Sequence, residues 1–274
     1  MDMQDKVTII TPTWNSEKYI RETIRSVQAQ SYQNWEMILV DDGSSDHTVE
    51  IAMQIADTDP RIKVIRQPVN RGAASARNRA LAESSGRFIA YLDADDLWMP
   101  EKLAVQTAFM KANDCGFSCA SYEVIGDDGV PKNKTVHMLP RVNYTGFLTN
   151  NLLQTVGIMV DTHLVDRKYL VMPDLKRRQD AATWLQILRA GYDCYGLPEV
   201  LGQYRRSKGS LSSNKWKAVR NIWTLYRQVE QLPLSFSCYC FVRYAALAVW
   251  KRLYPVRSAG REQSATASKI MIKR

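Results

Sequence analysis

Residues 88–96, Phe-Ile-Ala-Tyr-Leu-Asp-Ala-Asp-Asp, join a short apolar run to a group of carboxylates. The apolar run, Phe88–Leu92, has the length and composition of a buried β-strand. Asp93 and Asp95 follow it in a loop, where two carboxylates can face one hard cation such as Mg²⁺ or Mn²⁺. The same residues could instead form an Asx turn that caps the next helix, so this pattern alone leaves both interpretations open.

Outward from this stretch, strand and helix patterns alternate through the first 115 residues. The expected elements are strands at Val7–Ile10, Trp35–Val40 and Ile62–Ile65 and an Ala-rich helix at residues 72–84. This alternation predicts a parallel sheet with right-handed crossovers and helices on both faces. Polar clusters follow three of the strands, at Thr11–Asn15, Asp41–Ser45 and Asp93–Asp96. Because the carboxyl ends of parallel strands meet at one edge, the clusters predict a binding site there.

The pattern changes after residue 116. The expected elements are a hairpin of Cys119–Ile125 with Lys134–Leu139, a strand at Gly157–Val160, a helix after Asp180, and helices from Lys215 onward, interrupted near Pro233. We therefore predict an α/β fold with a mostly parallel, Rossmann-like sheet and a helical C-terminal extension.

The charge is divided unequally along the chain. The 274 residues have a formal net charge of +9, but residues 1–130 carry 13 Lys/Arg against 20 Asp/Glu, and residues 131–274 carry 24 against 8. Apolar residues are spread along the whole length, which excludes disorder as the main state. No uninterrupted apolar run of about 18 residues occurs, which argues against a conventional membrane-spanning helix. The two parts are expected to meet different partners.

Several classes of protein are disfavoured by motifs that the sequence lacks. The five cysteines are an odd number without zinc-ribbon spacing, and no signal peptide is evident. These features predict free thiols in a reducing cytoplasm. Neither Gly-x-Gly-x-x-Gly nor the Walker pattern is present, which counts against a dinucleotide oxidoreductase and a P-loop NTPase.

Two arginines, Arg71 and Arg77, flank the start of the helix expected at residues 72–84. Backbone N–H groups at a helix start and nearby guanidinium groups favour an anion such as a diphosphate. By itself the signal is weak, because an arginine near a helix end is usually solvated.

Together these segments resemble the family 2 glycosyltransferases, which are inverting, metal-dependent enzymes of the GT-A fold. The segments that carry the resemblance are Val7-Thr-Ile-Ile-Thr-Pro-Thr-Trp-Asn15, Ile38-Leu-Val-Asp-Asp-Gly-Ser-Ser-Asp46, Asn70-Arg-Gly, Ala76-Arg-Asn78 and Tyr91-Leu-Asp-Ala-Asp-Asp-Leu-Trp-Met-Pro100. The resemblance is dense over residues 5–110 and looser to about residue 215. It implies a nucleotide-sugar donor and a divalent cation, Mn²⁺ or Mg²⁺.

The resemblance assigns donor-binding roles to residues of the N-terminal part. Asp42 matches the carboxylate that contacts the nucleotide base, and Pro12 and Trp14 line the same pocket. Asp93 and Asp95 match the Asp-x-Asp motif, in which Asp95 is nearest the metal. Arg71 and Arg77 would stabilise the charge that develops on the leaving diphosphate.

The resemblance also implies a catalytic base. Arg177-Arg178-Gln179-Asp180, followed by Trp184-Leu185, is similar to the Glu-Asp motif of the family, and Asp180 falls on the base. It would take the proton of the acceptor hydroxyl in a single displacement. Gln179 replaces the usual Glu. Ser207 stands where the family has His, so no role of that His is carried over.

The C-terminal part is basic and aromatic. Residues 203–274 contain 15 Lys/Arg and only two acidic residues, Glu230 and Glu262. Leu234–Trp250 is largely apolar but contains Arg243, which favours an amphipathic helix in the headgroup layer of an anionic membrane. The alternative is a helix packed on the catalytic domain. A nucleic-acid partner is disfavoured, because the other half is acidic and no nucleic-acid module is recognisable.

The basic residues after the last expected strand suggest how an acceptor is held. Arg205, Arg206 and Lys208 could bind the phosphates of a lipid-linked, diphosphate-bearing acceptor near Asp180. The predicted organisation is a nucleotide-sugar-binding half at 1–115, an acceptor-binding half of the same domain at 116–214, and a basic amphipathic helical tail at 215–274.

The resemblance and the tail together imply a bacterial-type inverting glycosyltransferase. It would move a sugar from a nucleotide donor of the UDP type to a lipid-linked saccharide during surface polysaccharide assembly, on the inner face of the cell membrane. The alternative is a non-catalytic nucleotide-sugar-binding or scaffold protein of a membrane assembly. Intact carboxylates at the donor and base positions argue against that alternative.

Overall fold

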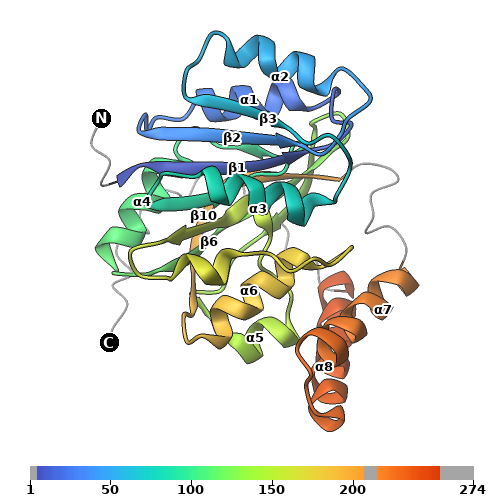
Figure 1. Ribbon diagram of the computed structural model, residues 1–274. Coiled ribbons are helices and arrows are strands. Elements are labelled where there is room, and N and C mark those ends of the chain that lie inside the picture. Colours follow the sequence, from blue (N-terminus) through green and yellow to red (C-terminus); the bar gives the residue numbers. More distant parts are fainter. Residues whose placement is uncertain (1–4, 207–214, 254–274) are drawn as a thin grey trace.

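The computed structural model describes residues 5–206 and 215–253 and is built around one 10-stranded mixed sheet (Figure 1). The strands are β1 (Val7–Thr13), β2 (Trp35–Asp41), β3 (Ile62–Arg66), β4 (Phe88–Tyr91), β5 (Leu97–Trp98), β6 (Phe117–Gly126), β7 (Pro131–Val136), β8 (Arg141–Val142), β9 (Ile158–Asp161) and β10 (Cys194–Arg206). Their order is β3-β2-β1-β4-β9-β6-β10-β5, with β7 paired to β6 and β8 to β10.

The N-terminal part forms the parallel side of the sheet, as the sequence predicts. β3, β2, β1 and β4 are parallel neighbours. The helices between them are α1 (Ile20–Gln28), α2 (Thr48–Ala56) and α3 (Ala73–Glu83). The chain moves outward from β1 to β3 and then returns past β1 to β4. Right-handed crossovers therefore place α1 and α2 on one face and α3 on the other, an arrangement that can be followed in Figure 1.

The second part extends the same sheet with mixed strand directions. β9 is antiparallel to both β4 and β6, whereas β10 runs parallel to β6. The predicted hairpin is confirmed as β6 and β7, and the predicted strand near residue 158 as β9. The helices here are α4 (Lys102–Ala112), α5 (Tyr144–Thr149) and α6 (Gln179–Arg189), with short 3₁₀ turns at η2 (Thr155–Gly157) and η3 (Arg167–Leu170).

The last described elements are helical, with the predicted break near Pro233. They are α7 (Lys215–Thr224), the π-helix η4 (Leu225–Val229) and α8 (Leu234–Leu253), which lie beside α5 and α6 at the lower end of the molecule in Figure 1. Glu230 fixes this helical unit to the sheet domain, because its buried carboxylate accepts a hydrogen bond from Tyr144 Oη (2.5 Å) and pairs with Arg189 (3.2 Å). Within the residues described, none of the helices is both long and apolar enough to cross a bilayer.

Candidate active site

The ends of β1, β2 and β4 meet at one edge of the sheet. Ile10 pairs in register with Ile38 on one side and with Tyr91 on the other, so the polar segments that follow these strands begin side by side. The amide of Asp42 also donates to Thr13 O (2.9 Å). Parallel pairing thus brings together three clusters that are far apart in the sequence, as predicted.

Asp42 closes a loop over the end of β2. Its two carboxylate oxygens accept the backbone N–H groups of Arg71 and Gly72, each at 2.7 Å, and the residue is only 3% exposed. Gly72 has φ 90°, a conformation that disfavours other residues at this turn. The Arg71 side chain and the Trp14 ring remain exposed on the rim, and Pro12 is half-buried beside them. Because each oxygen of Asp42 retains a lone pair, the carboxylate can still accept a ligand N–H.

The loop after β4 separates an accessible pair of carboxylates from a buried one. Thr23 Oγ1 donates to Ala94 O (2.9 Å) and Asp96 O (3.0 Å), which fixes the loop to α1. Asp96 is 1% exposed and accepts the backbone N–H of Arg205 at 2.8 Å, so it is a structural residue. Asp93 and Asp95 are half-buried at the rim. Burial and the charge of Asp93 raise the pKa of Asp95 to about 6.

Arg77 lies beneath this loop. Its Nη2 donates to Asp93 Oδ1 at 2.5 Å, and the residue is 5% exposed. Burial opposes its charge, but the carboxylates of Asp93 and Asp180 outweigh that effect and raise its pKa. Arg77 is thus buried and paired with Asp93, and its predicted contact with a diphosphate stays a prediction. Its guanidinium acts within the protein, between the Asp-x-Asp loop and the predicted base.

Asp180 occupies the first turn of α6, and α6 is packed against the end of β4. Trp184 is fully buried and meets the Tyr91 ring edge-on at 5.2 Å between centroids. The segment that leads into α6 is held by Asn78, whose amide donates to Met172 O and whose carbonyl accepts from Met172 N, each at 2.8 Å. These contacts fix the start of α6 relative to α3, so Asp93, Arg77 and Asp180 lie in one electrostatic group.

Arg205, for which the sequence predicts a phosphate-binding role, is buried and paired within the protein, so that role stays a prediction. Its guanidinium donates to Glu22 Oε2 and to Asp95 O, each at 2.7 Å, and it lies 4.9 Å from the centroid of the Tyr19 ring. With 3% of its surface exposed, it fastens β10 to α1 and to the acidic loop. Arg206 is exposed, and Lys208 lies outside the described residues.

Sequence reasoning missed three residues that hold the site. Thr23 supports the acidic loop, Glu22 neutralises Arg205, and Asn78 orients the segment before Asp180. Asn78 stands inside a quoted motif, which was a usable signal. Glu22 and Arg205 are 183 residues apart, and no local pattern announces their pairing.

Known proteins match most of the chain. The family model described as "Glycosyl transferase family 2" matches residues 8–170. The "Putative teichuronic acid biosynthesis glycosyltransferase TuaG" of Bacillus subtilis (strain 168) is 42% identical over 247 residues, which are 90% of this chain and 97% of that protein. The "UDP-Glc:alpha-D-GlcNAc-diphosphoundecaprenol beta-1,3-glucosyltransferase WfgD" of Escherichia coli is 33% identical over 92% of this chain and 97% of that protein.

Solved structures show the same fold. S. aureus TarS 1–349 in complex with UDP-GlcNAc superposes with a TM-score of 0.66 at 22% identity, over 88% of this chain and 71% of that one. The mannosyltransferase PcManGT from Pyrobaculum calidifontis, in complex with GDP-Man and Mn²⁺, gives 0.64 at 19% identity, over 90% and 75%. The fold is GT-A, and the protein is a transferase rather than a non-catalytic scaffold. The chain belongs to glycosyl transferase family 2.

Proposed function

We propose that this enzyme transfers a sugar from a UDP-sugar to a lipid-linked, diphosphate-bearing saccharide, with inversion, in bacterial surface polysaccharide synthesis. Relatives named for teichuronic acid synthesis and for a diphosphoundecaprenol-linked acceptor support the substrate class. The observation that carries the proposal is the buried Arg77, which joins Asp93 to the surroundings of Asp180. The guanidinium of Arg77 thereby links the predicted donor-binding residue Asp93 with the predicted base Asp180, which would act on the acceptor.

In the proposed reaction, each residue acts on one part of the substrates. Asp42 accepts an N–H of the base, and the exposed Trp14 ring packs against it beside Pro12. Arg71 lies at the rim and compensates charge on the leaving diphosphate. Asp180 removes the proton of the acceptor hydroxyl as that oxygen attacks the anomeric carbon from the opposite face. One displacement inverts the configuration and needs no covalent nucleophile.

Asp93 and Asp95 would hold Mn²⁺ or Mg²⁺. Burial and the nearby charge of Asp93 raise the pKa of Asp95, and a divalent cation between the two half-buried carboxylates would relieve that repulsion. Within the described residues no cluster of three acidic, His or Cys ligands occurs. The two carboxylates of Asp93 and Asp95 are the donor set expected for a cation that also binds substrate phosphates and water. When bound, the ion neutralises charge on the departing diphosphate.

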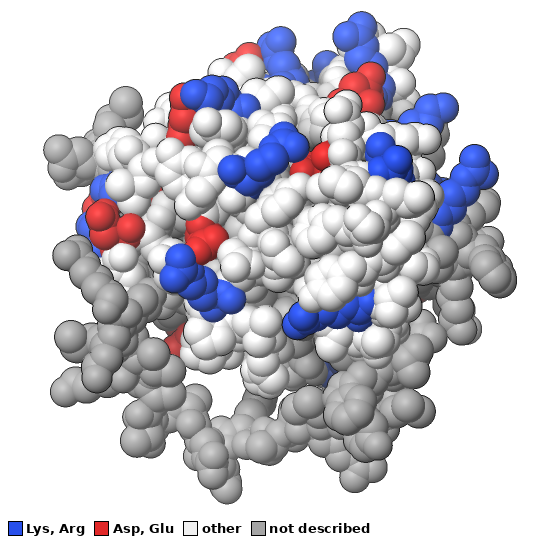
Figure 2. Space-filling view, turned by 90° about the horizontal axis from the view of Figure 1, so that it is seen from below, with Lys and Arg blue, Asp and Glu red and all other residues white. Residues whose placement is uncertain are grey.

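The C-terminal helices support a membrane role for residues 215–274, on the inner face of the cell membrane. α8 buries Ser237 and Cys240 against the domain and exposes Leu234, Tyr239 and Val242 on the opposite side. The helix can therefore both pack on the catalytic domain and lie in the headgroup layer of a membrane. One of its faces packs on the domain, and the opposite, apolar face is exposed. Figure 2 shows Lys and Arg interspersed with Asp and Glu around a broad uncharged area of the lower face, so this face has no concentrated basic patch of the kind that binds nucleic acid.

The catalytic part is tested by Asp180→Asn. We expect kcat for UDP release, with a lipid diphosphate saccharide as acceptor, to fall by about 1,000-fold while UDP binding is retained. Asp174→Asn is the matched control, because it makes the same charge change at an exposed position six residues earlier. Unchanged turnover in Asp180→Asn would show that Asp180 is not the base.

The membrane part is tested by Leu234→Asp combined with Val242→Asp. Binding to vesicles that contain anionic lipid should weaken by about tenfold, because two apolar side chains are lost from the interface. The control pair, Met53→Asp with Val130→Asp, changes exposed apolar residues elsewhere, at 46% and 59% exposure against 59% and 66% for Leu234 and Val242. Equal vesicle binding by both double variants would remove α8 from the membrane surface.

A further inference from the structure

Two loops of the predicted donor site differ in how deeply their key side chains are buried. One loop follows β1 and carries Trp14, and the other follows β2 and carries Asp42. β1 and β2 are parallel neighbours, so both loops leave the sheet at the same edge. The Trp14 ring is 56% exposed, whereas Asp42 is 3% exposed. A base bound between the two therefore requires that the exposed ring keep a fixed place beside the buried carboxylate.

Asn15 joins the two loops directly. Its backbone N–H donates to Ser44 Oγ (2.9 Å), and its side-chain carbonyl accepts the backbone N–H of Ser45 (2.9 Å). Ser44 is itself fixed, because its backbone N–H donates to the buried carboxylate of Asp41 (3.0 Å). Asn15 thus binds the β2 loop at two successive residues, once through its main chain and once through its side chain.

The backbone of Asn15 is left-handed, with φ 47°. Few residues other than glycine adopt this conformation, and asparagine is among those that tolerate it best. Because Asn15 follows Trp14 directly, this turn of the chain sets the direction of the segment that carries the ring. Position 15 therefore needs two properties at once, which are tolerance of a left-handed backbone and a side-chain hydrogen-bond acceptor.

The links between the loops continue beyond Asn15. The N–H of Ser16 donates to Thr48 Oγ1 (2.6 Å), and the N–H of Glu17 donates to Asp46 Oδ2 (3.1 Å). Ser16 Oγ also donates to Trp14 O (3.2 Å), which fixes the carbonyl of the residue that carries the ring. Segments 15–17 and 44–48 therefore form one unit, which Asn15 connects to the exposed tryptophan.

We propose that Asn15 is a positioning residue of the donor site, which holds the Trp14 ring in place relative to the Asp42 carboxylate without contacting the donor. The inference rests on the proposed function and deepens it, because Trp14 and Asp42 are assigned there to the base of the nucleotide. Without the link both groups are still present, but the ring can move. Affinity for UDP then falls, while the chemical step at saturating donor is preserved.

Three substitutions separate the two properties of Asn15. UDP is titrated into the full chain by calorimetry with Mg²⁺ present. Asn15→Ala loses both properties and should weaken UDP binding by about tenfold, whereas Asn15→Gly keeps the backbone but loses the acceptor and should weaken it by about fivefold. Asn15→Asp keeps both and should stay within about twofold of wild type, in about 0.5 M salt that screens the added charge. The value of kcat at saturating donor should be unchanged in all three variants.

Asn133→Ala is the matched control, because Asn133 is also exposed and left-handed (φ 49°) but lies on β7. It should leave UDP affinity unchanged. A double-mutant cycle shows whether Asn15 acts through the ring. In a Trp14→Ala background, Asn15→Ala should weaken UDP binding by less than about twofold. Thermal unfolding confirms that each variant is folded.

Equal UDP affinity in wild type and Asn15→Ala would overturn the inference. It would also be overturned if Asn15→Asp were as weak as Asn15→Ala, because the amide would then contact the donor itself. Additive losses in the cycle with Trp14→Ala would mean that Asn15 does not act through the ring. A wild-type chain that binds no UDP would refute the proposed donor as well, whereas equal binding by wild type and the Asn15 variants would refute only the role of Asn15.

Discussion

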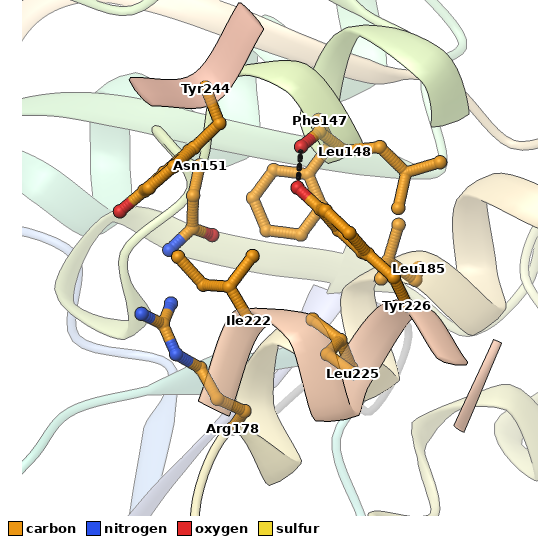
Figure 3. A pocket seen from close by; sticks show the side chains of 9 residues that line it. All are labelled: Phe147, Leu148, Asn151, Arg178, Leu185, Ile222, Leu225, Tyr226 and Tyr244. Atoms are coloured by element: carbon orange, nitrogen blue, oxygen red, sulfur yellow. Dashed lines mark hydrogen bonds between the residues drawn. The ribbon is translucent and has the colours of Figure 1, made fainter. Parts of the chain in front are cut away.

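The two sides of the start of α6 treat positive charge in opposite ways. On the α3 side, Arg77 is buried and paired with Asp93 at 2.5 Å. On the α8 side, Arg178 lines an apolar pocket (Figure 3) and has no partner among the described residues. A buried, paired arginine fixes geometry, because removing either partner leaves an uncompensated charge. An unpaired, half-exposed arginine meets its hydrogen-bonding capacity with water instead.

The largest effect is expected from Arg77→Met. Loss of the pair with Asp93 should misplace the acidic loop relative to Asp180 and lower kcat by about 100-fold, with little change in UDP affinity. The free energy of unfolding should fall by about 2 kcal/mol, because Asp93 is partly exposed and can regain water. Turnover, UDP titration and urea denaturation check these outcomes, and Arg79→Met serves as control. A variant with weakened UDP binding and normal kcat would instead return Arg77 to the diphosphate.

Lys102 is buried where no ligand can reach it, and replacing it is expected to raise the free energy of unfolding rather than lower it. Lys102 is 0% exposed, its ammonium lies 4.4 Å from the Trp98 ring centroid and 2.5 Å from Gln106 Oε1, and burial lowers its pKa to about 7. In the unfolded chain the pKa of Lys102 has its ordinary value of 10.5. Between about pH 7 and pH 10.5 the unfolded chain therefore binds more protons than the folded protein, and stability rises with pH. Lys102→Met should therefore stabilise the protein by about 2 kcal/mol near pH 8, after the lost contacts are subtracted.

The pH series identifies the cause of that stabilisation. The advantage of Lys102→Met over wild type should shrink as pH approaches 10.5, because the lysine is then neutral in both states. Lys111→Met, an exposed lysine on the same helix, should change stability by about 0.5 kcal/mol or less. Destabilisation by Lys102→Met at every pH would mean that its contacts outweigh the burial cost.

The smallest effect is expected where α7, η4 and α8 are attached to the sheet domain through Glu230. Tyr144→Phe removes the hydrogen bond to the buried Glu230 carboxylate and should cost about 1.5 kcal/mol in urea denaturation. Tyr239→Phe, at an exposed position on α8, should stay within about 0.5 kcal/mol. If the two changes had equal effects, Glu230 would not be the anchor of the helical unit.

Much of the parallel half was predictable because its signals are local. Apolar runs of strand length, such as Trp35–Val40, end at polar clusters, and parallel pairing needs no further information to bring those ends together. The hairpin at Asp127–Gly129 and the break near Pro233 were predictable from turn and helix-breaking residues. β9 was predicted as a strand, but not its antiparallel insertion between β4 and β6, since strand direction depends on long-range packing.

The sequence by itself determined that a parallel sheet presents Asp42, Asp93 and Asp95 at one edge and that Asp180 opens a helix, because periodicity and spacing are properties of the local chain. Only the tertiary structure shows which partner each arginine side chain has. Arg205 pairs with Glu22, 183 residues away, Arg77 is buried and pairs with Asp93, and Arg178 lines a pocket to which α5, α6, α7, η4 and α8 all contribute. A charge is neutralised by what lies near it in space, and only folding sets those distances.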